Sequence, residues 1–133
     1  MELKPIRILV VDDDPELLQL VKVLLERIQA ETITAENAKA AAQILRTSPL
    51  PDLLILDLML PDISGIEFLR QMRARSEFDS IPVLVLSALI DPLHIKEALE
   101  AGADRYLTKP YIVNNLLSVV QEILRTGRKV PRS

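Results

Sequence analysis

Five short runs of apolar or β-branched residues along the chain predict five β-strands. Residues 6–11, 53–56 and 81–86 are apolar runs, broken only by Arg7 in the first, as expected for strands covered on both faces of a sheet. Residues 31–35 alternate and are β-branched, and residues 105–108 form a short run. These two patterns favour strands nearer the edges of the sheet.

Between the strand-like runs, apolar residues recur at the three- and four-residue spacing of amphipathic helices. In residues 15–28 this spacing gives one apolar face, made of Leu17, Leu18, Val21, Leu24, Leu25 and Ile28. Residues 38–45, 66–72, 92–99 and 112–124 predict four further helices. Strands that alternate with helices indicate βαβ units and right-handed crossovers. We therefore predict an α/β fold, a doubly wound, five-stranded parallel sheet with five helices.

Capping residues support these boundaries. Asp14-Pro15 and Asp91-Pro92 are typical of an N-cap followed by the first helical position, and Asn37 can cap the second helix. Gly102 stands where the fourth helix should end, a position that favours a left-handed backbone.

Composition narrows the function classes. A chain of 133 residues with 49% hydrophobic residues is the size of one domain with one sizeable core. It has no cysteine, which excludes a thiolate zinc site, and the lone His94 cannot build a metal site by itself. The net charge of −3 argues against direct nucleic-acid binding by this domain. Without an apolar signal segment or a span of roughly 18 apolar residues, we expect a cytoplasmic domain that does not contact a membrane.

Chemically active residues stand just after four of the five predicted strands. Asp12-Asp13-Asp14 follow the first strand, Asp57 the third, Ser87 and Ala88 the fourth, and Lys109 the fifth. The carboxyl ends of parallel strands meet at one edge of the sheet, which is where ligands bind in open α/β sheets. Carboxylates that converge there would repel one another unless a cation lies among them, and Mg²⁺ prefers such oxygen ligands.

The same residues suit phosphoryl transfer. An Asp carboxylate can act as a nucleophile toward phosphorus, while a metal, a lysine and a hydroxyl neutralise the charge on the oxygens. Each residue alone also has an ordinary explanation. The Asp run can be a solvated helix start, Lys109 a loop lysine, and Ser87 the end of a strand. The hypothesis therefore depends on the residues being found together.

The motifs closely resemble those of the receiver domain of bacterial response regulators, including the chemotaxis-type single-domain receiver. The resemblance covers residues 5–126 in order, through the first strand with its Asp run, Asp57 to Gly65, Ser87-Ala88, and Gly102 to Tyr111. It implies a flavodoxin-like, three-layer fold in a domain of residues 1–126. Residues 127–133 are then a C-terminal tail or a linker.

The resemblance also implies how the site works. Asp57 would be the phosphorylated residue, with Mg²⁺, or Mn²⁺ as a substitute, held by Asp13, Asp57 and the backbone carbonyl of Met59. Asp12 would contribute to the metal through water. The phosphoryl oxygens would be bound by Ser87, Lys109 and the backbone amide of Ala88, and the bond before Pro110 would be a cis peptide. Ser87 and Tyr106 would form the switch that changes the surface of the fourth helix, fifth strand and fifth helix.

Partners follow from the same resemblance. The phosphoryl donor would be a sensor histidine kinase or a histidine phosphotransfer protein, and the receiver would control a downstream output protein or domain without being an enzyme in its own right. A phosphorylation-dependent homodimer stays open. The charged dimer surface of the DNA-binding class is expected to be incomplete, because the fifth helix carries Asn115, Ser118, Val119 and Val120 where that class has charged partners.

Three alternatives remain on the residues alone. A haloacid-dehalogenase-type phosphatase resembles a pattern with a second Asp two residues after the first, where this chain has Met59. A flavodoxin-like cofactor binder needs a phosphate-cradling loop after the first strand, where this chain has three acids. A receiver fold used only as a binding scaffold would not need Asp57, Ser87 and Lys109 together.

Overall fold

The computed structural model describes residues 5–109 and 112–128, which form one parallel sheet flanked by helices. The five strands lie in the order β2-β1-β3-β4-β5, and all four pairings are parallel. Their bounds are β1 Arg7–Val11, β2 Glu31–Ala35, β3 Leu53–Leu56, β4 Val83–Ser87 and β5 Arg105–Thr108. The prediction that the first, third and fourth strands are central is confirmed, as is the doubly wound fold.

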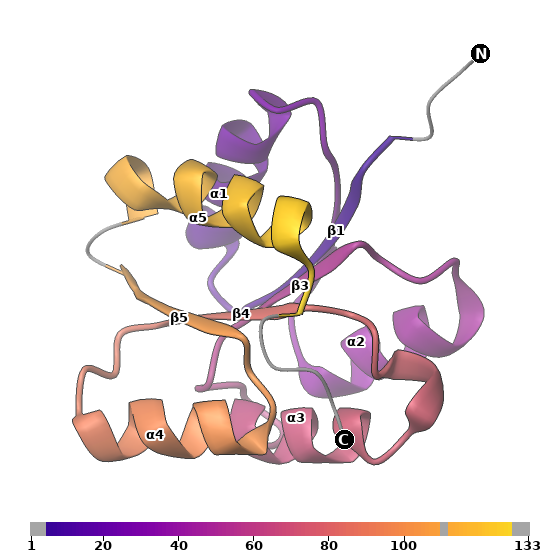
Figure 1. The fold of residues 1–133 in the computed structure, drawn as a ribbon, viewed down its shortest axis with the longest axis vertical. Coiled ribbons are helices and arrows are strands. Elements are labelled where there is room, and N and C mark those ends of the chain that lie inside the picture. Colours follow the sequence, from indigo (N-terminus) through magenta and orange to yellow (C-terminus); the bar gives the residue numbers. More distant parts are fainter. Residues whose placement is uncertain (1–4, 110–111, 129–133) are drawn as a thin grey trace.

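Helices cover both faces of the sheet (Figure 1). In the described residues they are α1 Pro15–Glu26, α2 Ala38–Thr47, α3 Gly65–Arg73, α4 Pro92–Ala101 and α5 Ile112–Thr126. Helices α1 and α5 lie together on one face, while α2, α3 and α4 cover the other. The arrangement is the predicted three-layer sandwich.

Two apolar clusters fill the space on either side of the sheet, and neighbouring strand residues point into different ones. Leu9 and Val11 of β1 belong to the cluster beneath α2, α3 and α4, whereas Ile8 and Val10 belong to the cluster beneath α1 and α5. In α5, Leu116 and Val120 are fully buried. The apolar face of α5 is therefore mainly a core face.

Local signals set the ends of the helices as predicted. The side chains of Asp14, Asn37 and Asp91 accept hydrogen bonds from backbone amides in the first turns of α1, α2 and α4. Gly102 ends α4 with a φ of 119°, a conformation that favours glycine. Ser64 caps α3 in the same manner, which the sequence reading did not name.

Element boundaries differ from the expectation by one or two residues. The fourth strand begins at Val83 and not at Ile81, because Pro82 lacks an amide hydrogen for the ladder. Helix α1 ends at Glu26 in a tight turn that places Gln29 at a φ of 61°. A 3₁₀ turn, η1 at Ser76–Phe78, was not predicted. None of the helices in the described residues combines the length and apolar content needed to span a bilayer.

Candidate phosphoryl and metal site

The ends of four strands bring the predicted site residues to one edge of the sheet. Asp12 directly follows β1 and Asp57 directly follows β3, and the amide of Asp57 donates to the carbonyl of Val11 at 3.0 Å. Ser87 is the last residue of β4, and Lys109 directly follows β5. The register of a parallel sheet thus assembles a site from residues up to 97 positions apart, Asp12 and Lys109 being the outermost (109 − 12).

Three carboxylates form a cluster at this edge. Asp12, Asp13 and Asp57 each present an oxygen, and these oxygens all lie within 4.8 Å of one another. Asp12 and Asp57 are only 2% and 3% exposed, while Asp13 is exposed to solvent. Carboxylate oxygens at this spacing suit a hard divalent cation such as Mg²⁺, so the residues present fit the metal that the sequence predicts.

Lys109 supplies the positive charge among these acids. Its Nζ lies 3.0 Å from Oδ2 of Asp12 and 3.3 Å from Oδ2 of Asp57. Burial acts to lower the pKa of Lys109, but its contacts with Asp12 and Asp57 outweigh burial and raise the pKa above its ordinary value. Lys109 is therefore a fixed cation between two buried carboxylates.

Asp57 stays electrostatically strained in spite of this lysine. Burial and then repulsion from Asp12 raise the pKa of Asp57, and they outweigh the opposing effects of Lys109 and of the Met59 amide. The Met59 amide donates to Oδ1 of Asp57 at 3.3 Å. A dication beside Asp57 would relieve the remaining repulsion.

Gly65 allows α3 to start against the backbone of Asp57. A Cβ at this position would collide with the carbonyl oxygen of Asp57 and lie 2.6 Å from Cα of Leu58. The amide of Gly65 also donates to the Leu58 carbonyl at 2.8 Å. Only glycine lets the loop after β3 fold back this closely, and this packing fixes the position of Asp57.

Leu89 links Ser87 to Tyr106. The Leu89 amide donates to Oγ of Ser87 at 3.2 Å, and the Leu89 carbonyl accepts the hydroxyl of Tyr106. Ser87 is fully buried and Tyr106 half-buried. Burial raises the pKa of Tyr106, which keeps its hydroxyl protonated and able to donate. The two predicted switch residues, Ser87 and Tyr106, are thus both hydrogen-bonded to the backbone of Leu89.

The remaining predicted residues are placed as follows. Met59 is 58% exposed in the loop after β3, and Ala88 is exposed just after β4. The predicted cis peptide at Pro110 lies outside the described residues. Two charged residues at the start of β5 have partners within the chain, because Arg105 pairs with Glu122 and Asp104 with Arg73.

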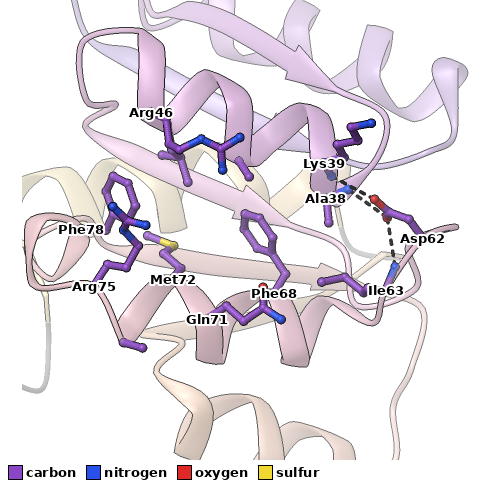
Figure 2. Close-up of a pocket in the computed structure, with 13 residues that line it drawn as sticks. Ala38, Lys39, Arg46, Asp62, Ile63, Phe68, Gln71, Met72, Arg75 and Phe78 are labelled. Carbon is purple, nitrogen blue, oxygen red and sulfur yellow. Dashed lines mark hydrogen bonds between the residues drawn. The ribbon is translucent and has the colours of Figure 1, made fainter.

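Asp62 plays a structural part that the sequence reading did not identify. Its carboxylate accepts hydrogen bonds from the amides of Ala38 and Lys39 at 3.0 and 2.9 Å, and so ties the loop after β3 to the first turn of α2 (Figure 2). These bonds, with the Ala38 amide first, lower the pKa of Asp62. A carboxylate is stabilised beside the positive end of a helix. The sequence offers no sign of this contact, because the helix that Asp62 contacts lies far from it along the chain.

A groove of about 520 Å³ lies beside Asp62, between α2 and α3. Figure 2 shows Phe68 and Met72 of α3 on one side of it, with Arg46 of α2 facing them. None of the predicted phosphoryl or metal residues lines this groove. The candidate site is thus a cluster of charges at the sheet edge, separate from this groove.

The protein is a doubly wound α/β domain with clustered carboxylates at the carboxyl edge of its sheet, and comparisons with known proteins identify the family. The family model for the response regulator receiver domain matches residues 8–121. This chain belongs to that family, and it is the receiver domain of a response regulator in two-component signalling.

Two curated relatives illustrate the match. The DNA-binding dual master transcriptional regulator RpaA of Synechocystis is 36% identical over 127 residues, covering 96% of this chain and 52% of that protein. The phosphate regulon transcriptional regulatory protein PhoB of Escherichia coli is 36% identical over 119 residues, covering 90% of this chain and 52% of that protein. The chain therefore spans about half the length of these relatives.

Solved structures show the same fold. A putative response regulator from Chloroflexus aurantiacus superposes with a TM-score of 0.86 at 33% identity, covering 92% of this chain and 99% of that one. The chemotaxis response regulator CheY4 of Vibrio cholerae has a TM-score of 0.83 at 28% identity, covering 90% of this chain and 99% of that one. Both matches extend over nearly the whole described fold.

Proposed function

We propose that this receiver domain accepts a phosphoryl group on Asp57 in a Mg²⁺-dependent reaction. The observation that carries the proposal is the buried Asp57 carboxylate held between Asp12 and Lys109 at the carboxyl edge of the sheet. Charges that only stabilise a sheet edge do not need two buried acids around one lysine. A phosphoacceptor site does need this arrangement, because it must hold both a free carboxylate and a phosphorylated one.

The transfer step follows from the chemistry of these groups. A carboxylate oxygen of Asp57 attacks the phosphorus of a phosphohistidine on a histidine kinase or a histidine phosphotransfer protein. The new O–P bond forms as the P–N bond breaks, and the electron pair stays on the departing imidazole nitrogen, which takes a proton from solvent. The product is an acyl phosphate on Asp57. Lys109, the hydroxyl of Ser87 and the amide of Ala88 then hold the phosphoryl oxygens.

The acids define the metal preference. Asp13, Asp57 and the backbone carbonyl of Met59 would bind the ion directly, and Asp12 through water. Bound Mg²⁺, or Mn²⁺ in its place, neutralises charge on the phosphoryl oxygens. The part of the protein itself is to keep the acids close together in spite of their repulsion, which the backbone of β1 and β3 does.

The Ser87–Leu89–Tyr106 connection suits a switch. If Ser87 turns toward a phosphoryl group, its Oγ leaves the amide of Leu89, and the loop that also binds the Tyr106 hydroxyl is released. A change of local charge would thus reach the surface formed by α4, β5 and α5. We infer that this domain signals to an output partner and is not an enzyme beyond its own phosphorylation and dephosphorylation.

We also propose a location and partners. The domain acts in the cytoplasm, receives its phosphoryl group from a sensor kinase, and does not contact nucleic acid or a membrane directly. The name of RpaA indicates a DNA-binding regulator, and the name of PhoB a transcriptional regulator. In such a protein a further domain would bind the DNA. A phosphorylation-dependent homodimer remains part of the proposal, although Arg105 and Asp104 already have partners within the chain.

Acetyl phosphate with Mg²⁺ tests the phosphoacceptor directly. The intact protein should gain the mass of one phosphoryl group, and Asp57→Asn should not. Asp14→Asn is the matched control, because Asn also caps a helix and the substitution removes a neighbouring charge while keeping the backbone amide that donates to Asp12. Labelling of Asp57→Asn would overturn the proposal. Rapid repeated turnover of the donor without a stable adduct would instead indicate a phosphatase.

A further inference from the structure

The chain that leaves α5 returns to the domain through Arg128. Its Nε donates to Oδ1 of Asp104 at 3.0 Å, its Nη1 to the carbonyl of Asp79 at 3.0 Å, and its Nη2 to the carbonyl of Gly102 at 3.2 Å. Nη1 also lies 3.6 Å from Oδ1 of Asp79. The side chain of Arg128 is only 11% exposed, although it lies beyond the end of the last helix. An arginine with this many hydrogen bonds is unusual in a segment that follows the last helix of a domain.

The acceptors come from two separate parts of the fold. Asp79 lies in the connection between η1 and β4, whereas Gly102 and Asp104 lie in the turn between α4 and β5. Both connections precede strands, so they lie at the edge of the sheet opposite Asp57 and Lys109. Arg128 therefore bridges two segments, one before β4 and one between α4 and β5.

Contacts other than those of Arg128 already fix the position of its acceptors. The second carboxylate oxygen of Asp104 accepts the Val83 amide at 2.9 Å and pairs with Arg73 at 3.3 Å. The left-handed conformation of Gly102 ends α4 at this point, and its carbonyl also accepts Arg73. A planar guanidinium matches such a fixed set of acceptors, and a lysine ammonium does not.

At the end of α5, the Gly127 amide donates to the Ile123 carbonyl at 2.7 Å, but this bond does not reach the α4–β5 turn. A cavity of about 220 Å³ separates part of the end of α5 from β5, and Asp104, Ile123, Gly127 and Arg128 are among the residues that line it. A Cβ on Gly127 would meet no atom within 4 Å. The hydrogen bonds of Arg128 are thus the principal contact between this segment and the α4–β5 turn in the described residues.

We propose that Asp79, Gly102 and Asp104 form an arginine-docking site that fixes the direction in which the chain leaves the receiver domain, and that couples the α4–β5 turn to the segment following α5. The docking stands on the geometry alone. The coupling rests on the proposed phosphoacceptor function, because phosphorylation is what would move the turn.

The docking is tested by NMR on the full chain without activation. In the wild type, the Arg128 Nε–H should exchange slowly, and Gly127 should be as rigid as α5. Arg128→Ala should make Gly127 mobile and shift the amide signals of Gly102 and Arg105, and Arg128→Lys should do the same. Arg125→Ala is the matched control, because it removes the same charge from an exposed position one helical turn earlier. Unchanged signals in Arg128→Ala, or full rescue by lysine, would overturn the docking site.

Beryllofluoride with Mg²⁺ tests the coupling. The Gly127 amide should shift in the wild type when the adduct forms, and this shift should be lost in Arg128→Ala while Gly102 still responds. An equal Gly127 response in both proteins would overturn the coupling, as would no response in the wild type when signals around Asp57 show that the adduct has formed. If no adduct forms at Asp57, the phosphoacceptor function fails and the coupling fails with it, while the unactivated comparison still decides the docking.

Discussion

The ammonium of Lys109 lies 3.3 Å from the Asp57 carboxylate and 3.0 Å from that of Asp12, so one cation serves two buried anions. Burial is the largest cause of the raised pKa of Asp57 and repulsion from Asp12 the second, and the single positive charge of Lys109 does not offset them. The site is thus short of positive charge in the absence of a metal. This imbalance gives the two predictions that follow.

Removing the lysine should destabilise the fold. In Lys109→Ala, the buried oxygens of Asp12 and Asp57 lose their ionic partner, and losing such a partner costs about 1–3 kcal/mol. Urea unfolding without Mg²⁺ measures this loss, and added Mg²⁺ should recover part of it. Lys22→Ala, at an exposed position of α1, is the control and should change stability by less than about 0.5 kcal/mol. Equal stability of the two variants would contradict the role given to Lys109.

Removing the Asp57 charge should have the opposite effect near neutral pH. Because the folded-state pKa of Asp57 is raised above 3.8, the folded state binds this proton more tightly than the unfolded state does. Stability from this group is therefore full below pH 3.8 and is lost as the pH rises through the raised pKa. Asp57→Asn should melt at a higher temperature than the wild type near neutral pH, with the difference shrinking in acid. A neutral-pH melting temperature below that of the wild type would refute the charge imbalance.

Much of this site could be predicted because it depends on strand ends. Apolar runs located β1, β3 and β4, and the polar residue after each run was then bound to lie at the carboxyl edge, as Asp12 and Asp57 do. Because parallel strands all point the same way, residues that follow different strands in the sequence lie close together in space.

Contacts that depend on loop paths were not predictable in this way. Asp62 reaches the start of α2, and Arg128 reaches Asp79 and Asp104, through backbone turns that carry no periodic pattern. In each case the residue types indicate a charge that seeks a partner, but the partner is set by tertiary packing. Gly65 was predictable only in part. Its motif could be seen in the sequence, but its close approach to the Asp57 backbone is visible only in the structure.

The close approach at Gly65 predicts a cost for any side chain. Gly65→Ala would drive a methyl group into the backbone of Asp57 and Leu58, and overpacking of this kind costs about 1–3 kcal/mol. Because the loop must shift, the rate of labelling by acetyl phosphate should also fall. Gly127→Ala is the control: its φ of 71° brings a strain of about 1–2 kcal/mol, but the open space around it should leave labelling unchanged. Normal labelling of Gly65→Ala would show that the loop adapts without moving Asp57.

The link between Asp62 and α2 should depend on pH. The pKa of Asp62 lies below 3.8, so its contribution to stability is present above pH 3.8 and is lost as the pH falls through the lowered pKa. Asp62→Ala should lower the melting temperature near neutral pH, and the difference from the wild type should vanish in strong acid. Asp62→Asn keeps one acceptor oxygen and should fall between the two. A pH-independent difference would mean that Asp62 acts by packing and not by its charge.

The lifetime of the acyl phosphate should be set by the residues at the mouth of the site. Met59 is 58% exposed beside Asp57, and Leu89 packs partly against the core, so neither offers a polar atom to orient an attacking water from its side chain. General-base assistance is then missing, and we expect self-dephosphorylation over minutes or longer. Met59→Asn should shorten the lifetime several-fold, measured as phosphate release after the donor is removed, and Leu50→Asn, the same kind of change at a 45% exposed leucine that precedes β3 at the opposite edge, should not. A wild-type lifetime of seconds would show that water reaches the phosphorus without help from either side chain.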